Sequence, residues 1–147
     1  MKSQTLTAWN PSELSDMCLP PCHGDFQCFV RQSVHGEKRL SLHMVQRSCD
    51  LFLGVPYNIA SYGYLLHMLA EVSGCVAHEL VITLNDAHIY EAHVEAVETQ
   101  LLRTPHPLPT LQIRRPGVSS FSLDDFKMGD FNLFNYHPDE AIRAPLL

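Results

Sequence analysis

Residues 46–62 read QRSCDLFLGVPYNIASY and join an expected strand to an expected helix. Just before this stretch, Leu40–Met44 alternates between apolar and polar residues, which is typical of a strand with one buried face. Beyond it, apolar residues recur at helical spacing from Asn58 to Val72, and Gly74 is well placed to end that helix in the left-handed conformation. This succession predicts a fold that contains both kinds of element.

The flanking sequence adds further strands and helices to this centre. A second alternating run at 26–30, followed by a turn that contains Gly36, predicts a β-hairpin with the strand at 40–44. Asn10, followed by a proline, predicts a helix start near the N-terminus. Downstream we expect strands at 79–84, 87–90 and 110–114 and a helix at 92–102. Without a repeat or a composition break, the chain is expected to form a single α/β or α+β domain over residues 1–147.

Composition places the chain among ordinary globular proteins. Of its 147 residues 46% are hydrophobic and 18% charged, a balance that argues against disorder. The net charge of -6 and the pI near 5.8 leave no basic footprint for DNA or RNA. We expect neither a membrane span nor a signal peptide. The cysteines, odd in number and without a C-x-x-C pair, favour reduced thiols and a cytoplasmic protein. They are Cys18, Cys22, Cys28, Cys49 and Cys75.

The side chains around residues 22 and 47 are suited to covalent chemistry on a phosphorylated molecule. Cys22 follows two prolines, and a thiol becomes a good nucleophile when a nearby cation favours its thiolate. Arg47 and Ser48 together form a common way of holding a phosphate, with Asp50 close behind. The alternatives are a buried structural thiol at Cys22 and a surface ion pair of Arg47 with Asp50 or Glu37.

Several segments form an ordered series along the chain. They are Ala8-Trp9-Asn10, Leu19–His23, residues 46–62, Asp86–Tyr90, Pro105–Pro109 and Ile142–Pro145. In this order they resemble the thymidylate synthase family over nearly the whole chain. The match corresponds to about the C-terminal half of a typical member. It implies an α+β fold, a mixed β-sheet packed against long buried helices, that lacks the family's N-terminal portion.

The resemblance implies a specific reaction for Cys22. Carbon 5 of uracil is a poor nucleophile until a group adds to carbon 6, and a thiolate is suited to that addition because it can also leave again. In the family the cysteine after the two prolines adds to dUMP, and 5,10-methylenetetrahydrofolate supplies the one-carbon unit and then a hydride, which completes the methyl group of dTMP. The other four cysteines are expected to be structural, including Cys49 within the longest motif.

The resemblance also assigns binding residues. The substrate-binding set is Arg47, Ser48, Cys49, Asp50, Asn58, His88, Ile89 and Tyr90, and the folate-binding set is Asp50, Leu53, Gly54 and Tyr57. Arg47 would hold the phosphate and help keep Cys22 ionised. The amide of Asn58 can pair with the O4 and N3–H edge of uracil, although a helix N-cap is an alternative. His88 and Tyr90, two apart on an expected strand, would share one face and hold the sugar hydroxyl, with core packing as the alternative.

Other histidines receive no catalytic or metal role. His23 lies beside the nucleophile, but its matched role in the family is part of a hydrogen-bond network and not the base that activates the thiol. His88 and His93 are five residues apart and are not accompanied by an H-x-E or C-x-x-C arrangement. We therefore expect no metal, and a zinc-dependent deaminase is disfavoured.

The chain also departs from the family pattern. Asn85 replaces a glycine, which predicts a turn that tolerates positive φ, and Lys2 and Ser3 stand where two phosphate-binding arginines are usual. The C-terminus is about one residue shorter than is common, and the family's folate-side glutamate lies upstream of the matched region. We therefore expect a homodimer or a complex with a separate N-terminal half, and little turnover by the chain alone. The alternatives are a pyrimidine hydroxymethylase and a non-catalytic nucleotide-binding partner subunit.

Overall fold

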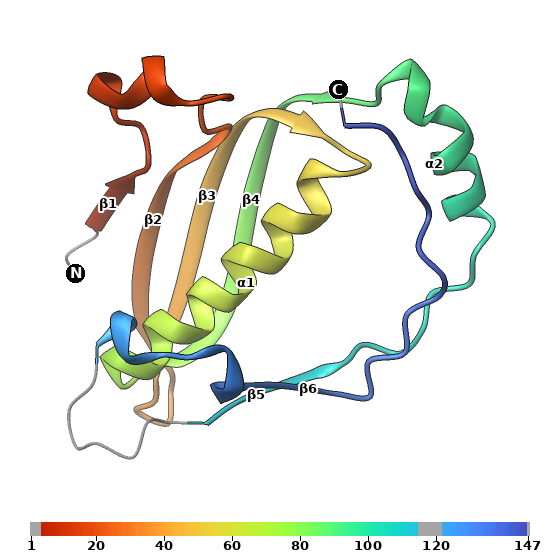
Figure 1. The fold of residues 1–147 in the computed structure, drawn as a ribbon. Helices are drawn as coiled ribbons and strands as arrows, with labels where there is room; N and C mark the ends of the chain where they lie inside the picture. The colour runs from red at the N-terminus through yellow and green to blue at the C-terminus, as the bar shows by residue number, and fades with distance from the viewer. Residues whose placement is uncertain (1–3, 115–121, 147) are drawn as a thin grey trace. The chain divides into compact units, whose positions relative to one another are not determined.

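The computed structural model describes residues 4–114 and 122–146, and the chain divides into two compact units, Met1–His88 and Ile89–Leu147 (Figure 1). The first unit contains β1 (Gln4–Thr7), the 3₁₀ helix η1 (Pro11–Asp16), β2 (His23–Gln32), β3 (Lys38–Asp50), α1 (Gly54–Ser73) and β4 (Val76–His88). The second contains η2 (Glu91–His93), α2 (Val94–Leu101), β5 (Thr110–Ile113), η3 (Leu123–Asp125), η4 (Met128–Asp130) and β6 (Phe131–Phe134). The α+β fold class is confirmed, and a single domain over residues 1–147 stays a prediction.

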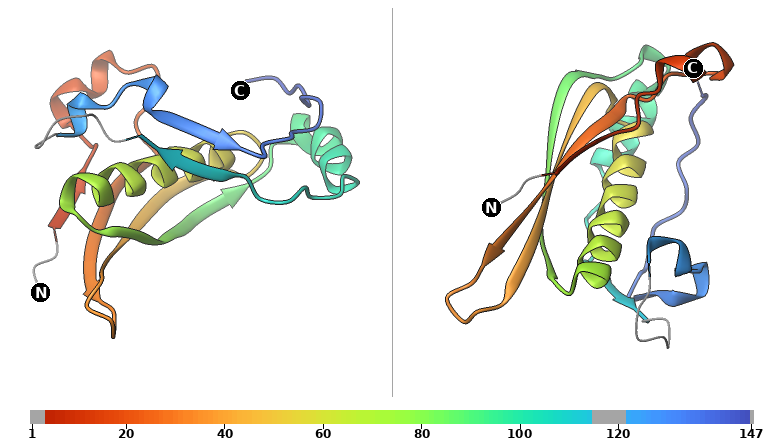
Figure 2. Two further views of the ribbon diagram at one scale, coloured as in Figure 1. Left: turned by 90° about the horizontal axis from the view of Figure 1, so that it is seen from below. Right: turned by 90° about the vertical axis from the view of Figure 1, so that its left-hand side faces the viewer.

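The first unit is a four-stranded sheet in the order β1-β2-β3-β4 with α1 against one face (Figures 1 and 2). β2 and β3 form the expected antiparallel hairpin, and the turn between them uses Gly36 at a φ of 84°, which glycine adopts without steric cost. β3 and β4 run parallel, so the chain must cross over between them, and α1 is that crossover. The first unit therefore has a mixed sheet, as expected.

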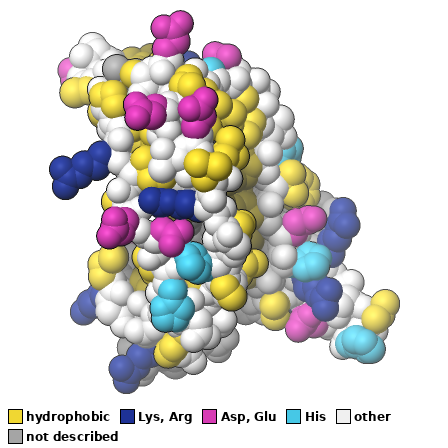
Figure 3. Space-filling view, turned by 90° about the vertical axis from the view of Figure 1, so that its right-hand side faces the viewer, with side chains coloured by type: hydrophobic (Ala, Val, Ile, Leu, Met, Phe, Trp, Pro, Cys, Tyr) yellow, Lys and Arg dark blue, Asp and Glu magenta, His cyan; other side chains and the backbone are white. Residues whose placement is uncertain are grey.

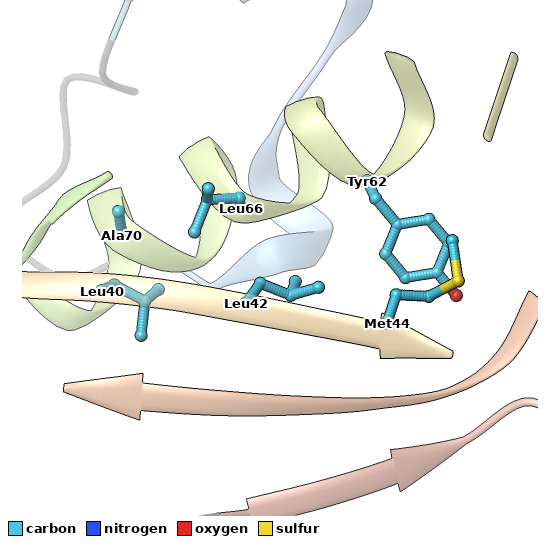
Figure 4. Close-up of a cluster of buried hydrophobic side chains, with 6 residues drawn as sticks. All are labelled: Leu40, Leu42, Met44, Tyr62, Leu66 and Ala70. Carbon is cyan, nitrogen blue, oxygen red and sulfur yellow. The ribbon is translucent and has the colours of Figure 1, made fainter. Parts of the chain in front are cut away.

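The core of this unit joins β3 to α1. The period of two in β3 points Leu40, Leu42 and Met44 toward the helix, where they meet Tyr62, Leu66 and Ala70 (Figure 4). Leu42 and Met44 are 0% exposed, and burying a side chain of this size contributes about 1.5–3 kcal/mol. This packing fixes the register of the strand that continues into residues 46–50.

The structure corrects the predicted start of α1 and confirms its predicted end. The helix begins at Gly54, four residues before the expected start at Asn58. It ends at Ser73, and Gly74 has the left-handed conformation with a φ of 63°, as the sequence predicted. At the N-terminus, Asn10 caps a helix as expected, but that helix is the 3₁₀ helix η1.

The second unit contains an element that the sequence did not predict. β5 pairs antiparallel with β6, a four-residue strand with no clear alternation in its sequence (Figure 2). η2 and α2 together span residues 91–101, which matches the helix expected at 92–102 except for Leu102, the C-cap residue. The separate strand expected at 87–90 was wrong, because β4 continues to His88 and the chain then turns into η2.

The surface carries mixed charge. On the face shown in Figure 3, acidic and basic side chains are scattered among hydrophobic ones and form no continuous basic field. All five cysteines are free thiols. Among the described residues, no helix combines the length and the apolar character needed to cross a membrane.

Candidate active site

The candidate residues of the first unit gather where β3 and β4 end. The parallel register pairs Ser48 with Asp86 and Asp50 with His88, so the carboxyl ends of both strands lie side by side. β2 runs antiparallel to β3, which brings its first residue, His23, opposite Gln46. Ligands commonly bind outside the carboxyl ends of parallel strands, because the chain leaves the sheet there and exposes polar groups.

The thiol of Cys22 lies against the guanidinium of Arg47. The backbone N–H of Arg47 donates to the carbonyl of Cys22 over 2.9 Å, which fixes the two residues side by side. The Nη2 of Arg47 then donates to the Sγ of Cys22 over 3.6 Å and to the carbonyl of Pro20 over 3.5 Å. A cationic donor in this position stabilises a thiolate more than a thiol, which is what a nucleophilic cysteine requires.

Two other cysteines have surroundings that oppose ionisation. Cys49 is 0% exposed, and burial is the main reason that its pKa is raised, with the charges of Asp86 and Cys22 acting in the same direction and a backbone hydrogen bond at Asn85 acting against it. Burial also raises the pKa of Cys28. Both are therefore suited to the structural role expected of them, since a buried thiol without a cation stays protonated.

Asn58 is held in one orientation by a residue that the sequence did not single out. Gln46 is 2% exposed, and its Nε2 donates to the carbonyl of Ser48 over 3.1 Å and to the Oδ1 of Asn58 over 2.9 Å. A carbonyl can only accept, so the atom of Gln46 that faces it must be the amide nitrogen. That nitrogen must in turn face the oxygen of Asn58, which directs the Nδ2 donors of Asn58 elsewhere.

The N-cap alternative for Asn58 is wrong, because Asn58 lies inside α1, whose N-cap residue is Leu53. The carboxylate of Asp50 accepts from the backbone N–H groups of Phe52 over 3.1 Å, Leu53 over 3.3 Å and Gly54 over 3.3 Å. These are donors at the start of a helix, where carboxylates are favoured. Asp50 therefore holds the turn that leads from β3 into α1 and accepts from the first N–H of the helix.

The three residues expected to contact folate besides Asp50 lie at this same helix start. Leu53 is the N-cap residue and Gly54 the first residue of α1. Tyr57, in the first turn, is 74% exposed. An aromatic ring that is this accessible is available for stacking on a planar ligand.

His88 and Tyr90 do not share a strand, contrary to the prediction. His88 is the last residue of β4, and its Nδ1 lies 3.0 Å from the carbonyl of Asp86, so Nδ1 carries the proton in that contact. Ile89 begins the second unit, and Tyr90 is the N-cap of η2. The two side chains do not alternate along one strand, because β4 ends at His88, two residues earlier than expected.

Comparison with known proteins is consistent with this arrangement. Residues 2–147 match the family model described as thymidylate synthase. The chain is 45% identical to a thymidylate synthase of Listeria innocua serovar 6a over 96% of its length, and 48% identical to that of Agaricus bisporus over 93%. The chain belongs to the thymidylate synthase family. It spans 42% and 46% of these two relatives, which is less than half of their length.

His23 is tied to the core of this thymidylate synthase family member. Its Nδ1 lies 3.3 Å from the hydroxyl of Tyr62, and that hydroxyl donates to the carbonyl of His23 over 3.3 Å. One hydroxyl proton cannot serve both contacts, so the Nδ1–H of His23 donates to the tyrosine oxygen. Burial raises the pKa of Tyr62, which keeps this hydroxyl protonated. The geometry supports a hydrogen-bond network for His23.

The structure also bears on the ion-pair alternative for Arg47, on the turn expected at Asn85 and on the metal expectation. The ion pair considered between Arg47 and Glu37 does not form, because Glu37 pairs with Arg39 at 2.8 Å. The guanidinium of Arg47 donates to Cys22 and Pro20. Asn85 lies within β4, and among the described non-glycine residues the one with positive φ is Asn135, so the turn expected at Asn85 was wrong. Within the described part of the chain, no group of three or more metal-ligating side chains is arranged to hold an ion. Lys2 and Ser3 lie outside the described residues.

Proposed function

We propose that this chain is the nucleotide-binding, nucleophile-bearing portion of a thymidylate synthase that methylates dUMP to dTMP. The hydrogen bond of 3.6 Å from the Nη2 of Arg47 to the Sγ of Cys22 is the observation that carries the proposal. It supports a thiolate at Cys22 that adds to carbon 6 of uracil, and the electron pair displaced to carbon 5 attacks the methylene carbon of 5,10-methylenetetrahydrofolate. The attack opens the methylene bridge at N10 of the folate, and loss of the carbon 5 proton then expels N5, which leaves an exocyclic methylene on carbon 5. Hydride from the tetrahydrofolate adds to this methylene as the thiolate leaves carbon 6, which gives dTMP and dihydrofolate.

The other site residues would bind and orient the two substrates. A guanidinium has five donors, so Arg47 can contact the phosphate of dUMP together with Ser48 and still donate to the thiol. The Nδ2 of Asn58 would donate to uracil O4 and its Oδ1 would accept from N3–H. His88 and Tyr90 would hold the sugar, with Cys49 and Ile89 as further contacts. Asp50, Leu53, Gly54 and Tyr57 would form the folate side.

A second polypeptide is part of the proposal. The chain spans less than half of its relatives' length, and Leu102, Leu108 and Met128 are 89%, 90% and 89% exposed. Large apolar side chains that are this exposed favour association, because burying them removes apolar area from water. We propose that a separate N-terminal half of the family, or a second copy of this chain together with that half, completes the site.

The test is a covalent trap. 5-Fluoro-dUMP has fluorine in place of the proton that must leave carbon 5, so the reaction stops with the enzyme sulfur attached to carbon 6. We expect the chain, supplied with an N-terminal half and methylenetetrahydrofolate, to gain the mass of both ligands. Cys22→Ala should abolish the adduct, whereas Cys18→Ala, which removes an exposed thiol, should retain it. An adduct on the Cys22→Ala protein would refute the assignment. With dUMP itself, the product mass separates a methyl from a hydroxymethyl group.

A further inference from the structure

The C-terminal segment of the second unit is held without secondary structure of its own. After β6, residues 136–146 form neither helix nor strand. Ile142 and Ala144 are half-buried while Ala141 and Arg143 are exposed, so alternate side chains turn inward. A segment without a backbone ladder needs other contacts to stay in place, because ordering each residue costs about 1–2 kcal/mol of conformational entropy.

The most buried of these contacts is made by His93. This residue of η2 is 1% exposed, and its Nε2 lies 2.8 Å from the carbonyl oxygen of Pro145, 52 positions along the chain. A carbonyl can only accept, so Nε2 must carry a proton. The ring also lies edge-on to Tyr90, with centroids 5.4 Å apart and an interplanar angle of 79°. The imidazole is thus fixed in both position and tautomer.

A second histidine contacts the same segment further upstream. The Nε2 of His106 lies 3.0 Å from the Oδ1 of Asp139, and this contact is the main reason that the pKa of Asp139 is lowered. Arg103 and Glu140 line the same hollow, of about 390 Å³, and are the other charged groups near the pair. The side chains of His106 and Asp139 are 49% and 41% exposed, so solvent weakens their attraction.

We propose that His93 is the anchor that fastens the C-terminal segment to the second unit, with His106 as a weaker upstream fastening. The hydrogen bond to Pro145 is part-buried and its donor, His93, is 1% exposed, so losing it costs more than losing the exposed ion pair. The contact of His93 with Pro145 should therefore stabilise the segment clearly more than the contact of His106 with Asp139. This inference concerns the stability of the segment and does not depend on the proposed reaction.

The test compares hydrogen exchange in residues 139–146 of the full chain and its variants. His93→Phe keeps a ring but removes the donor, and it should speed exchange about tenfold. His93→Gln places an amide N–H near the position of Nε2 and should restore exchange to within about twofold of the original chain. His106→Gln should change exchange by less than about threefold, and His78→Gln, at an exposed site in the first unit, should leave it unchanged.

A second measurement covers the case in which a variant does not fold. Nitrogen-15 spectra of the histidine rings in the unsubstituted chain should show His93 with its proton on Nε2. A His93 ring protonated on Nδ1 alone would overturn the proposal. Equal exchange in the folded His93→Phe and His93→Gln variants would also overturn it, because the proposal requires a difference between a side chain that donates a hydrogen bond and one that does not.

Discussion

Replacing Gln46 by methionine tests the link between the end of β3 and the base-reading residue. The change removes the amide that joins the carbonyl of Ser48, at 3.1 Å, to the Oδ1 of Asn58, at 2.9 Å. Each of these acceptors then lacks a buried donor, at a cost of about 1–3 kcal/mol. The Oε1 of Gln46 is itself buried without a hydrogen-bond partner among the described residues, so its removal relieves one cost of the same size. Two acceptors lose a donor and one unpaired oxygen is removed, so the free energy of unfolding should fall by about 1–3 kcal/mol in total.

The stability assay is urea unfolding followed by circular dichroism. With a urea m-value of about 1–3 kcal/mol per molar, the midpoint should fall by about 1 M. Gln27→Met is the matched control, because Gln27 lies in β2 and its bond of 3.1 Å to the Oγ1 of Thr5 is exposed. Surface changes of this kind usually stay within about 0.5 kcal/mol.

The binding assay asks whether Asn58 loses its preferred orientation. In the unsubstituted chain, rotating the Asn58 amide to suit cytosine would break its hydrogen bond to Gln46, at a cost of about 1–3 kcal/mol. That cost corresponds to an affinity for dCMP that is lower by about 5- to 150-fold. Gln46→Met removes that cost, so the ratio of dUMP to dCMP affinity should fall by a factor in this range. Calorimetric titration with both nucleotides measures it. An unchanged affinity ratio in a folded variant would refute the reasoning.

Four other outcomes are expected. Asn58→Asp should weaken the preference for dUMP over dCMP, measured by the same titration, because a protonated carboxyl offers an edge complementary to cytosine. Asp50→Ala should lower the urea midpoint by the equivalent of about 0.5–2 kcal/mol, since the backbone N–H groups of Phe52, Leu53 and Gly54 lose their acceptor; an unchanged midpoint would contradict this role. The pKa of Cys49 lies above its ordinary value of 9.0, so its contribution to stability is present below about pH 9 and is lost as the pH rises through the raised pKa. The urea midpoint should therefore fall between pH 8 and pH 10, and less steeply in Cys49→Ala. The chain alone should show little turnover in a tritium-release assay and gain it with a supplied N-terminal half; robust turnover alone would exclude the need for a partner.

Much of the first unit could be predicted from sequence because its signals are local, although the strand β1 was not predicted. The alternation in β2 and β3, the turn at Gly36 and the left-handed end at Gly74 each depend on residues close together in the chain. The start of α1 was missed because the carboxylate that accepts from the first N–H of the helix lies four residues earlier, at Asp50, and the sequence offered Asn58 as a more usual candidate. β6 was missed because a four-residue strand is specified by its partner β5, which lies far away along the chain.

The candidate site shows the same division between local and long-range information. Cys22 and Arg47 could be singled out by residue type, but their contact depends on the pairing of β2 with β3. Gln46 could not be singled out by residue type, since a glutamine at the end of a strand is ordinary. A weak signal did exist, because its position continues the buried alternation of β3 and a buried amide requires hydrogen-bond partners.

The junction of β3 and α1 makes folding and ligand binding depend on the same side chains. Asp50 both starts the helix and belongs to the proposed folate side, and Gln46 both satisfies Ser48 and orients Asn58. Changes at these two positions should therefore alter stability and affinity together. Cys22 is different, because it contacts the Pro20 carbonyl and the Arg47 guanidinium, and neither holds the core. Its loss should remove covalent chemistry at little cost in stability, and this separation is what distinguishes a nucleophile from a residue that only supports the site.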